Sequence, residues 1–279
     1  MKVACPASLP EALTMLSAEP SAIPLAGGTD IMVNWPQRLS AHQERYLDLS
    51  GVMELRSIRW TDDALVLGAM TTYWDVIEDG QVAAAFPMLV DAARQVGAVQ
   101  IQSRGTWAGN IVNASPAADG VPVLMAYDAI VVLESTAGRA EVPLADFYLG
   151  YKDLRRGPDQ LVTEIRIPRR SYRFHRFQKV GPRRALAITK VGVAVTCDGD
   201  DWRVVANSVA PTVCRCPAIE RRLSAGALSG PEDLLGPIRD DVSPIDDIRS
   251  TARYREAVLA RLIYHTVQDA ASSLNPHER

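Results

Sequence analysis

Cysteine, histidine and long apolar runs are scarce in this sequence of 279 residues. The four cysteines lie at positions 5, 197, 214 and 216, and so few at such irregular spacing argue against a disulfide scaffold and indicate a reducing compartment. Cys214 and Cys216 have no matching second pair, so we expect no zinc or iron–sulfur site in this chain. No apolar run reaches the roughly 20 residues of a membrane helix, and no segment resembles a signal peptide. We therefore expect a cytoplasmic protein without a membrane span.

Recognisable sets of catalytic side chains are lacking as well. The four histidines are scattered, at positions 42, 175, 265 and 277, and no Ser-His-Asp set or informative pair of carboxylates accompanies them. Each histidine is better explained as a surface or hydrogen-bonded polar residue than as a catalyst. We therefore assign no catalytic residue.

The charge of the chain is nearly balanced, at −3, which does not indicate a nucleic-acid-binding surface. Locally the balance differs, because residues 151–190 hold twelve lysines and arginines against three acidic residues. Such a segment is either a solvated basic face or a surface that attracts an anionic cofactor or an acidic partner subunit. The arginines that would dock an acidic partner are Arg155, Arg156, Arg169, Arg170, Arg173 and Arg176.

Helical and strand patterns are mixed through the first part of the chain. The capping-box spacing of Ser8 and Glu11 predicts a helix after it. A short apolar strand then stops at Gly27-Gly28, and a helix follows. The alternation over residues 45–49 predicts a further strand, and residues 58–68 and 130–142 predict two hairpins. Helices are expected after Thr71-Thr72, over residues 87–96 and over residues 122–127.

Two further segments are defined by composition. Residues 100–119 are rich in glycine, asparagine, serine and threonine, which predicts a long loop with a functional role. A strand over residues 161–167 runs into Pro168 and a polar cluster, where we place a domain boundary. The residues beyond it predict an α+β unit, with strands over 174–180, 187–196 and 203–210 and helices over 218–223 and 251–271.

Two glycine-bearing turns have the composition of anion-binding loops. The first spans residues 25–30 and contains Gly27 and Gly28, and the second spans residues 104–110. Glycine permits positive φ and lets backbone N–H groups approach a phosphate, while the following helix contributes its N-terminal dipole. Neither turn matches the spacing of a Rossmann or P-loop motif. A pair of such turns suits a pyrophosphate better than a single phosphate.

The sequence motifs around these turns resemble those of the FAD-binding medium subunits of the xanthine dehydrogenase and carbon monoxide dehydrogenase family, over nearly the whole chain. The resemblance is carried by residues 24–30 (PLAGGTD), 67–72 (LGAMTT), 102–119 (QSRGTWAGNIVNASPAAD), 179–188 (KVGPRRALAI) and 209–212 (VAPT). It implies an α+β protein with a two-part FAD-binding domain of the vanillyl-alcohol oxidase-like (PCMH) type over residues 1–168, divided near residue 57. A smaller α+β domain of the CO dehydrogenase flavoprotein type would follow over residues 169–279.

The resemblance also implies roles for individual residues. Those of the first loop, which would hold the diphosphate and the adjoining ribose, are Pro24, Leu25, Ala26, Gly27, Gly28, Thr29, Asp30 and Ile31. Those that would close the other side are Thr106, Ala108, Gly109, Asn110 and Val112. Ala118 and Asp119 would lie beside the ribityl chain and the flavin ring. Lys179 stands where the family often has a lysine near the flavin, whose charge would stabilise the reduced ring; the alternative is an exposed lysine in a basic strand. Trp107-Ala108 replaces the small Ile-Gly pair that is usual in the family's second loop, and the indole could alter adenine packing or the path to the flavin.

By this resemblance the chain would pass electrons from the [2Fe–2S] clusters of a small subunit to an external acceptor, whereas a large molybdopterin subunit would oxidise the substrate. The assembly would be a dimer of heterotrimers, with molybdopterin and the clusters on the partners only. Two alternatives stay open. One is a self-contained FAD-dependent dehydrogenase or oxidase that acts directly on a small organic substrate, and the other is a flavin-binding assembly module without turnover.

Overall fold

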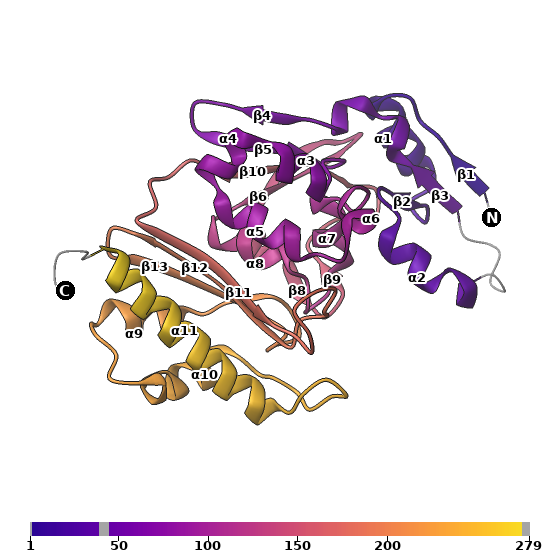
Figure 1. Cartoon of the computed structure of the whole chain (residues 1–279). Coiled ribbons are helices and arrows are strands. Elements are labelled where there is room, and N and C mark those ends of the chain that lie inside the picture. Colours follow the sequence, from indigo (N-terminus) through magenta and orange to yellow (C-terminus); the bar gives the residue numbers. More distant parts are fainter. Residues whose placement is uncertain (1, 39–44, 275–279) are drawn as a thin grey trace.

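The computed structural model describes residues 2–38 and 45–274 and begins with a small parallel sheet (Figure 1). Its three strands lie in the order β1 (Lys2–Ala4), β3 (Arg45–Asp48) and β2 (Ile23–Leu25). Helices α1 (Leu9–Ala18) and α2 (Thr29–Arg38) accompany it. The predicted cap of α1 is confirmed, since the Ser8 hydroxyl accepts from the Glu11 N–H at 3.4 Å. The Glu11 carboxylate accepts from the N–H of Ala7 rather than from that of Ser8.

A five-stranded antiparallel sheet follows. Its order is β4 (Ile58–Trp60), β5 (Ala64–Gly68), β10 (Leu161–Pro168), β6 (Ile130–Ser135) and β7 (Gly138–Pro143). Both predicted hairpins are confirmed, as the pairs β4–β5 and β6–β7. The helices beside this sheet are α3 (Tyr73–Glu78), α4 (Gly80–Ala85), α5 (Pro87–Gln95) and α8 (Gly120–Ala126). The short connecting elements are η2 (Leu49–Gly51), η3 (Met53–Leu55), η4 (Leu144–Asp146), β8 (Tyr148–Gly150) and β9 (Asp153–Leu154).

The prediction of a long loop over residues 100–119 is wrong. The segment contains the end of α6 (Val99–Gln102) and the whole of α7 (Trp107–Asn113). Thr106 caps α7, because its hydroxyl accepts from the N–H of Gly109 at 3.0 Å. Trp107 and Ile111 lie one helical turn apart and are both fully buried, so packing stabilises a helix that the polar composition had obscured.

The last sheet is antiparallel, in the order β11 (Phe174–Val180), β12 (Val191–Asp198), β13 (Asp201–Asn207) and β14 (Cys214–Arg215). Figure 1 shows it between α5 and α8 on one face and α9 (Pro217–Ser224), α10 (Leu235–Asp241) and α11 (Ala252–Leu274) on the other. Phe177, Ala194 and Val205 pack into the core of the first part of the chain. Val193, Val195 and their neighbours pack under α9 and α11. Both faces of the sheet are therefore buried.

Some predicted bounds in this part need correction. The strand expected from residue 187 begins only at 191, because residues 187–190 belong to a loop in which Leu186 has φ +54°. The strand expected to reach residue 210 ends at Asn207, before Ser208 at φ +63°. Helix α10 and the turn η5 (Pro231–Leu234) were not predicted, whereas α9 and α11 confirm the two expected helices.

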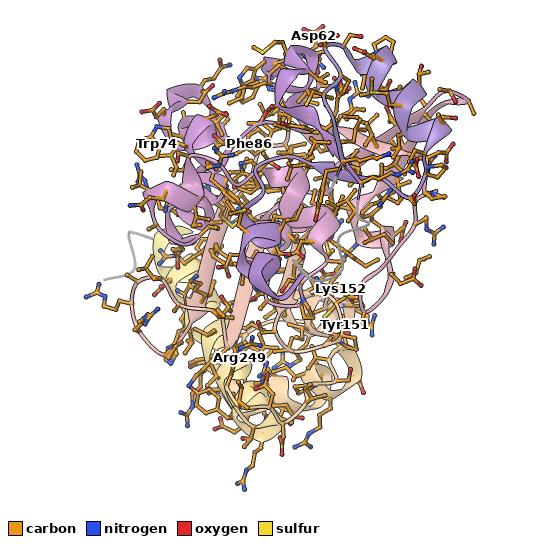
Figure 2. All side chains as sticks on the ribbon, turned by 90° about the vertical axis from the view of Figure 1, so that its right-hand side faces the viewer. Asp62, Trp74, Phe86, Tyr151, Lys152 and Arg249 are labelled. Atoms are coloured by element: carbon orange, nitrogen blue, oxygen red, sulfur yellow. The ribbon has the colours of Figure 1, made fainter. Side chains whose placement is uncertain are left out.

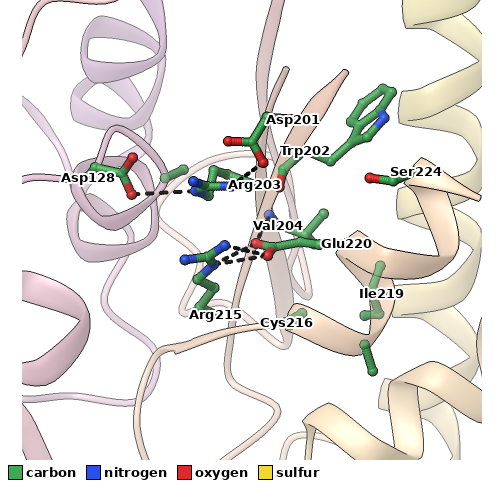
Figure 3. Close-up of polar contacts among 12 residues, drawn as sticks. Asp128, Asp201, Trp202, Arg203, Val204, Arg215, Cys216, Ile219, Glu220 and Ser224 are labelled. Carbon is green, nitrogen blue, oxygen red and sulfur yellow. Dashed lines mark hydrogen bonds and ion pairs between the residues drawn. The ribbon is translucent and has the colours of Figure 1, made fainter. Parts of the chain in front are cut away.

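Polar contacts join the two parts of the chain at the turn after α8. Asp128, at φ +53°, forms ion pairs with Arg170 at 2.9 Å and with Arg203 of β13 at 3.5 Å (Figure 3). Nearby, the Tyr127 hydroxyl and His175 Nδ1 are hydrogen-bonded at 3.1 Å. These contacts fix the four-stranded sheet against α8, and thereby fix the walls of the site described next.

Candidate functional site

The two predicted glycine turns are in direct contact. A Cβ added to Gly27 would lie 1.8 Å from the carbonyl oxygen of Arg104, so no other residue fits there without a shift of backbone. Gly28 has φ +71°, a conformation that favours glycine. The Arg104 side chain also donates from Nε to the carbonyl of Gly27 at 3.4 Å. The turns that lie far apart in sequence thus form one backbone cradle, from which α2 begins.

A first cavity of about 520 Å³ opens at this cradle. The predicted residues that line it are Pro24, Ala26, Gly27, Gly28, Thr29, Asp30, Ile31, Thr106, Ala108, Gly109, Asn110 and Val112. Leu25 is not among the lining residues. The cavity also includes Tyr73, whose pKa is raised by burial and, second, by the nearby charge of Asp119.

A second cavity of about 730 Å³ adjoins the first, between the four-stranded sheet and the loop that follows α7. Ala118 and Asp119 line it, as do residues from segments 186–188, 208–211 and 243–249. Three residues, Val96, Asn110 and Asn113, line both cavities. The structure thus brings both predicted loops and Ala118-Asp119 to two adjoining cavities, and we call the boundary formed by their three shared residues the neck.

Lys179 is buried behind Asp119 and lines neither cavity. Its ammonium lies 2.7 Å from Asp119 Oδ2, and the two side chains are 5% and 10% exposed. It also donates to the carbonyls of Gln95 and Ala187, while the Thr189 hydroxyl donates to Asp119 Oδ1 at 2.5 Å. The alternative of an exposed lysine is therefore wrong. Lys179 holds the Asp119 carboxylate at the wall of the second cavity.

Comparison with known proteins decides the family. The family model described as the FAD binding domain in molybdopterin dehydrogenase matches residues 1–170, which is more than half of the chain. The chain belongs to this molybdopterin dehydrogenase FAD-binding family. A second model, the CO dehydrogenase flavoprotein C-terminal domain, matches residues 176–270.

Relatives of the chain are similar along its whole length. It is 27% identical to the glyceraldehyde dehydrogenase medium chain of Sulfolobus acidocaldarius, over 95% of this chain and 96% of that one. It is 29% identical to the carbon monoxide dehydrogenase medium chain of Hydrogenophaga pseudoflava, over 95% of each. A solved structure of carbon monoxide dehydrogenase from Hydrogenophaga pseudoflava superimposes with a TM-score of 0.88 at 28% identity, covering 98% of both chains. The chain is therefore an FAD-binding oxidoreductase subunit of α+β fold, as the sequence predicted.

The lining of the neck is chemically suited to FAD. The cradle at Gly27 offers backbone approach for a diphosphate, next to the N-terminus of α2. Asn110 Oδ1 is buried and has no hydrogen-bond partner among the described residues, and it lies beside Gly120, where an added Cβ would be 2.9 Å from it. Two adjoining cavities, with the Gly27 cradle at the first, offer room for the two halves of a dinucleotide.

Trp107 lies in the core behind the second loop. Its indole is fully buried, packs against Tyr73 with ring centroids 5.0 Å apart, and lines neither cavity. Trp107 therefore belongs to the core behind the second loop and does not project into either cavity. Gly120 makes room for it, since a Cβ there would lie 3.1 Å from the indole.

Sequence reasoning missed several lining residues. Val96 and Asn113 belong to the neck, and the latter was quoted only as part of a motif. Arg156 lines the first cavity, where burial lowers the pKa of its guanidinium, and it donates to the carbonyls of Gly157 and Gln160. The C-terminal lining around Asp247 carried no local signal, because its segments meet only in the folded chain.

The six arginines considered for docking all have contacts within the chain. Arg170, Arg173 and Arg176 form ion pairs with Asp128, Asp200 and Asp269. Arg155 donates to the carbonyl of Asp146, and the Arg169 guanidinium lies 5.7 Å from the ring centroid of Trp60. Docking of an acidic partner on this surface stays a prediction.

Within residues 2–38 and 45–274 no group of three or more His, Cys, Asp or Glu side chains is placed to hold a metal ion. None of the helices described there is long and apolar enough to cross a membrane. All four cysteines are free thiols.

Proposed function

We propose that the chain holds FAD across both cavities and passes electrons from the [2Fe–2S] clusters of a small partner subunit to an external acceptor. The organic substrate is oxidised on a large molybdopterin subunit. The observation that carries this proposal is a pair of adjoining cavities, the first lined by both glycine turns, which share Asn110 and Asn113 in their linings. FAD, when bound, supplies chemistry that accepts single electrons and releases them in pairs, which amino-acid side chains cannot do.

The residues divide the cofactor between the two cavities. The residues of the first loop from Pro24 to Ile31 hold the diphosphate and the adjoining ribose. The residues that close the other side are Thr106, Ala108, Gly109, Asn110 and Val112. Ala118 and Asp119 lie beside the ribityl chain and the flavin ring. Lys179 acts through Asp119, because its contacts run to that carboxylate and to two carbonyls. Its positive charge would therefore act on a bound flavin by way of the Asp119 carboxylate.

A self-contained enzyme is less well supported. The charged side chains of the second cavity are engaged with one another or with Lys179. Asp119 pairs with Lys179, and Asp247 pairs with Arg255 at 2.6 Å and with Arg249 at 3.6 Å. A substrate that reacted directly at the flavin would need an acid or base free to exchange protons with it.

The assembly and its location extend the same proposal. Relatives of this chain are called medium chains or medium subunits, including those of carbon monoxide dehydrogenase and nicotine 6-hydroxylase. The chain accordingly works with a small [2Fe–2S] subunit and a large molybdopterin subunit, as a dimer of heterotrimers. Free cysteines suit the reducing cytoplasm. The FAD-binding domain spans residues 1–168, divided near 57, and the C-terminal domain spans 169–279.

Purification of the full chain with its co-purifying subunits tests this function. We expect one FAD per chain, iron–sulfur and molybdenum on the other subunits, and reduction of the flavin by an organic donor only when the large subunit is present. A flavin-free complex would contradict cofactor binding. Reduction of the flavin by the donor in the isolated chain would instead favour the self-contained enzyme.

A further inference from the structure

Three side chains from separate segments form a polar bridge at the surface of the site. Asp30 lies in the first turn of α2, Asn113 ends α7, and Lys152 lies in the turn between β8 and β9. Asn113 Nδ2 donates to Asp30 Oδ1 at 3.1 Å. The Lys152 ammonium donates to Asn113 Oδ1 at 2.9 Å and also to the Asn113 carbonyl. We call these three residues the Asn113 bridge.

The chemistry of the two outer residues fixes the amide of Asn113. An ammonium group can only donate hydrogen bonds, and a carboxylate can only accept them. The amide oxygen of Asn113 must therefore face Lys152, and its NH₂ group must face Asp30. A flipped amide would place donor against donor and acceptor against acceptor. The orientation of Asn113 thus depends on both neighbours.

The bridge follows the line between the two cavities. Asp30 lines the first cavity, Asn113 lines both, and Tyr151, the neighbour of Lys152, lines the second. Asp30 and Lys152 are exposed, so the bridge lies on the outer side of the neck. Figure 2 labels Tyr151, Lys152 and Arg249 in one view, and Tyr151 and Arg249 both line the second cavity. A dinucleotide with one end in each cavity has to pass Asn113.

The backbone of Lys152 is unfavourable for a lysine. Its φ is +59°, a left-handed conformation that is less favourable for a residue with a Cβ than for glycine. The β8 arm of this hairpin is held to α7 separately, because the Tyr148 hydroxyl donates to the carbonyl of Ile111 at 3.1 Å. The turn therefore needs no lysine for its attachment. The ammonium contact with Asn113 is the feature that a glycine would lack.

We propose that the Asn113 bridge is a strap that retains FAD: Lys152 and Asp30 position Asn113 across the neck, and the cofactor exchanges only when the bridge opens. This inference rests on the proposed binding of FAD across both cavities. Lys152 and Asp30 act as positioning residues, and Asn113 is the group that meets the dinucleotide.

The Lys152→Gly substitution separates this role from a structural one. It removes the ammonium group and relieves the backbone at the same time, so the cofactor-free chain should melt at the same or a higher temperature. Exchange of bound FAD for radiolabelled FAD, measured on the holoprotein, should accelerate about tenfold or more, as the loss of a hydrogen bond to a charged group implies. Lys152→Arg keeps the positive donor and should keep exchange slow.

A double-substitution cycle tests whether Lys152 acts through Asn113. Exchange in Lys152→Gly/Asn113→Ala should be no faster than in Asn113→Ala alone, because the amide to be positioned is already absent. Wild-type exchange rates in Lys152→Gly, or rate effects that multiply in the double variant, would overturn the bridge while FAD binding stands. If the purified wild-type protein contained no FAD and bound none when FAD was added, the proposed function would fail together with the bridge.

Discussion

The two cavities are built in different ways. The first is walled by backbone: Gly27 lies against the carbonyl of Arg104, and a single added carbon atom would close the approach. The second is walled by side chains from distant segments, which are held by pairs such as Lys179 with Asp119 and Arg255 with Asp247. A backbone cradle can recognise a diphosphate that every FAD carries, whereas a wall of paired side chains can be varied without loss of the cofactor. The two cavities therefore differ in the substitutions they tolerate, because the cradle admits no added carbon atom at Gly27, whereas the second cavity depends on pairs of side chains.

The largest expected effect comes from filling the cradle. In Gly27→Ala the new Cβ meets backbone at 1.8 Å, so the two turns must separate. We expect FAD binding to be lost and the free energy of unfolding to fall by about 2–4 kcal/mol, as measured by flavin titration and urea unfolding. Gly236→Ala is the control, because a Cβ there meets nothing within 4 Å. Normal FAD affinity in Gly27→Ala would show that the turns do not form the binding cradle.

Substitutions in the wall of the second cavity should mainly lower the free energy of unfolding. Lys179→Met leaves the Asp119 carboxylate buried without its cation, which costs about 3–5 kcal/mol when a buried pair loses one partner. The double variant Lys179→Met/Asp119→Asn should recover part of this loss in urea unfolding. A loss below about 1 kcal/mol in the single variant would mean that the pair is hydrated and not fixed as described.

Trp107 allows the stability of the second loop to be separated from the binding of FAD, because the indole packs behind that loop. Trp107→Phe leaves a small void in the core and should lower the free energy of unfolding by about 1–3 kcal/mol. FAD affinity should stay as in the wild type, since the indole lines neither cavity. A clear loss of affinity in a folded variant would place the indole in the cofactor space after all.

The smallest expected effect concerns His175, whose contact with Tyr127 joins the four-stranded sheet to the end of α8. Burial is the main cause that lowers the pKa of His175 below its ordinary 6.5, and the charge of Asp91 opposes it. The unfolded chain then binds the proton more readily, so this contribution to stability is complete above pH 6.5 and is lost as the pH falls below it. His175→Gln should weaken this dependence in thermal melts between pH 5 and 8. An unchanged pH profile would contradict a partly buried, neutral histidine at this contact.

The same contrast explains what the sequence could predict. The first cavity is lined largely by short contiguous sequence motifs, and almost all of the residues predicted for it line it. The second arises where residues 186–188, 208–211 and 243–249 meet, and no local pattern in them signals this. Polar composition around Thr106 also concealed α7, whose stability comes from the buried face of Trp107 and Ile111. Lys179 was identified as important, yet its burial behind Asp119 depends on tertiary packing alone.

Hydrogen exchange of the full chain, measured by mass spectrometry with and without FAD, tests the central claim most directly. If the dinucleotide spans both cavities, FAD should slow exchange in residues 25–31 and 105–119 together, and in the C-terminal segments 186–188 and 208–211. Protection confined to one of the two loops, or absent from both, would contradict a cofactor held across the neck at Asn110 and Asn113.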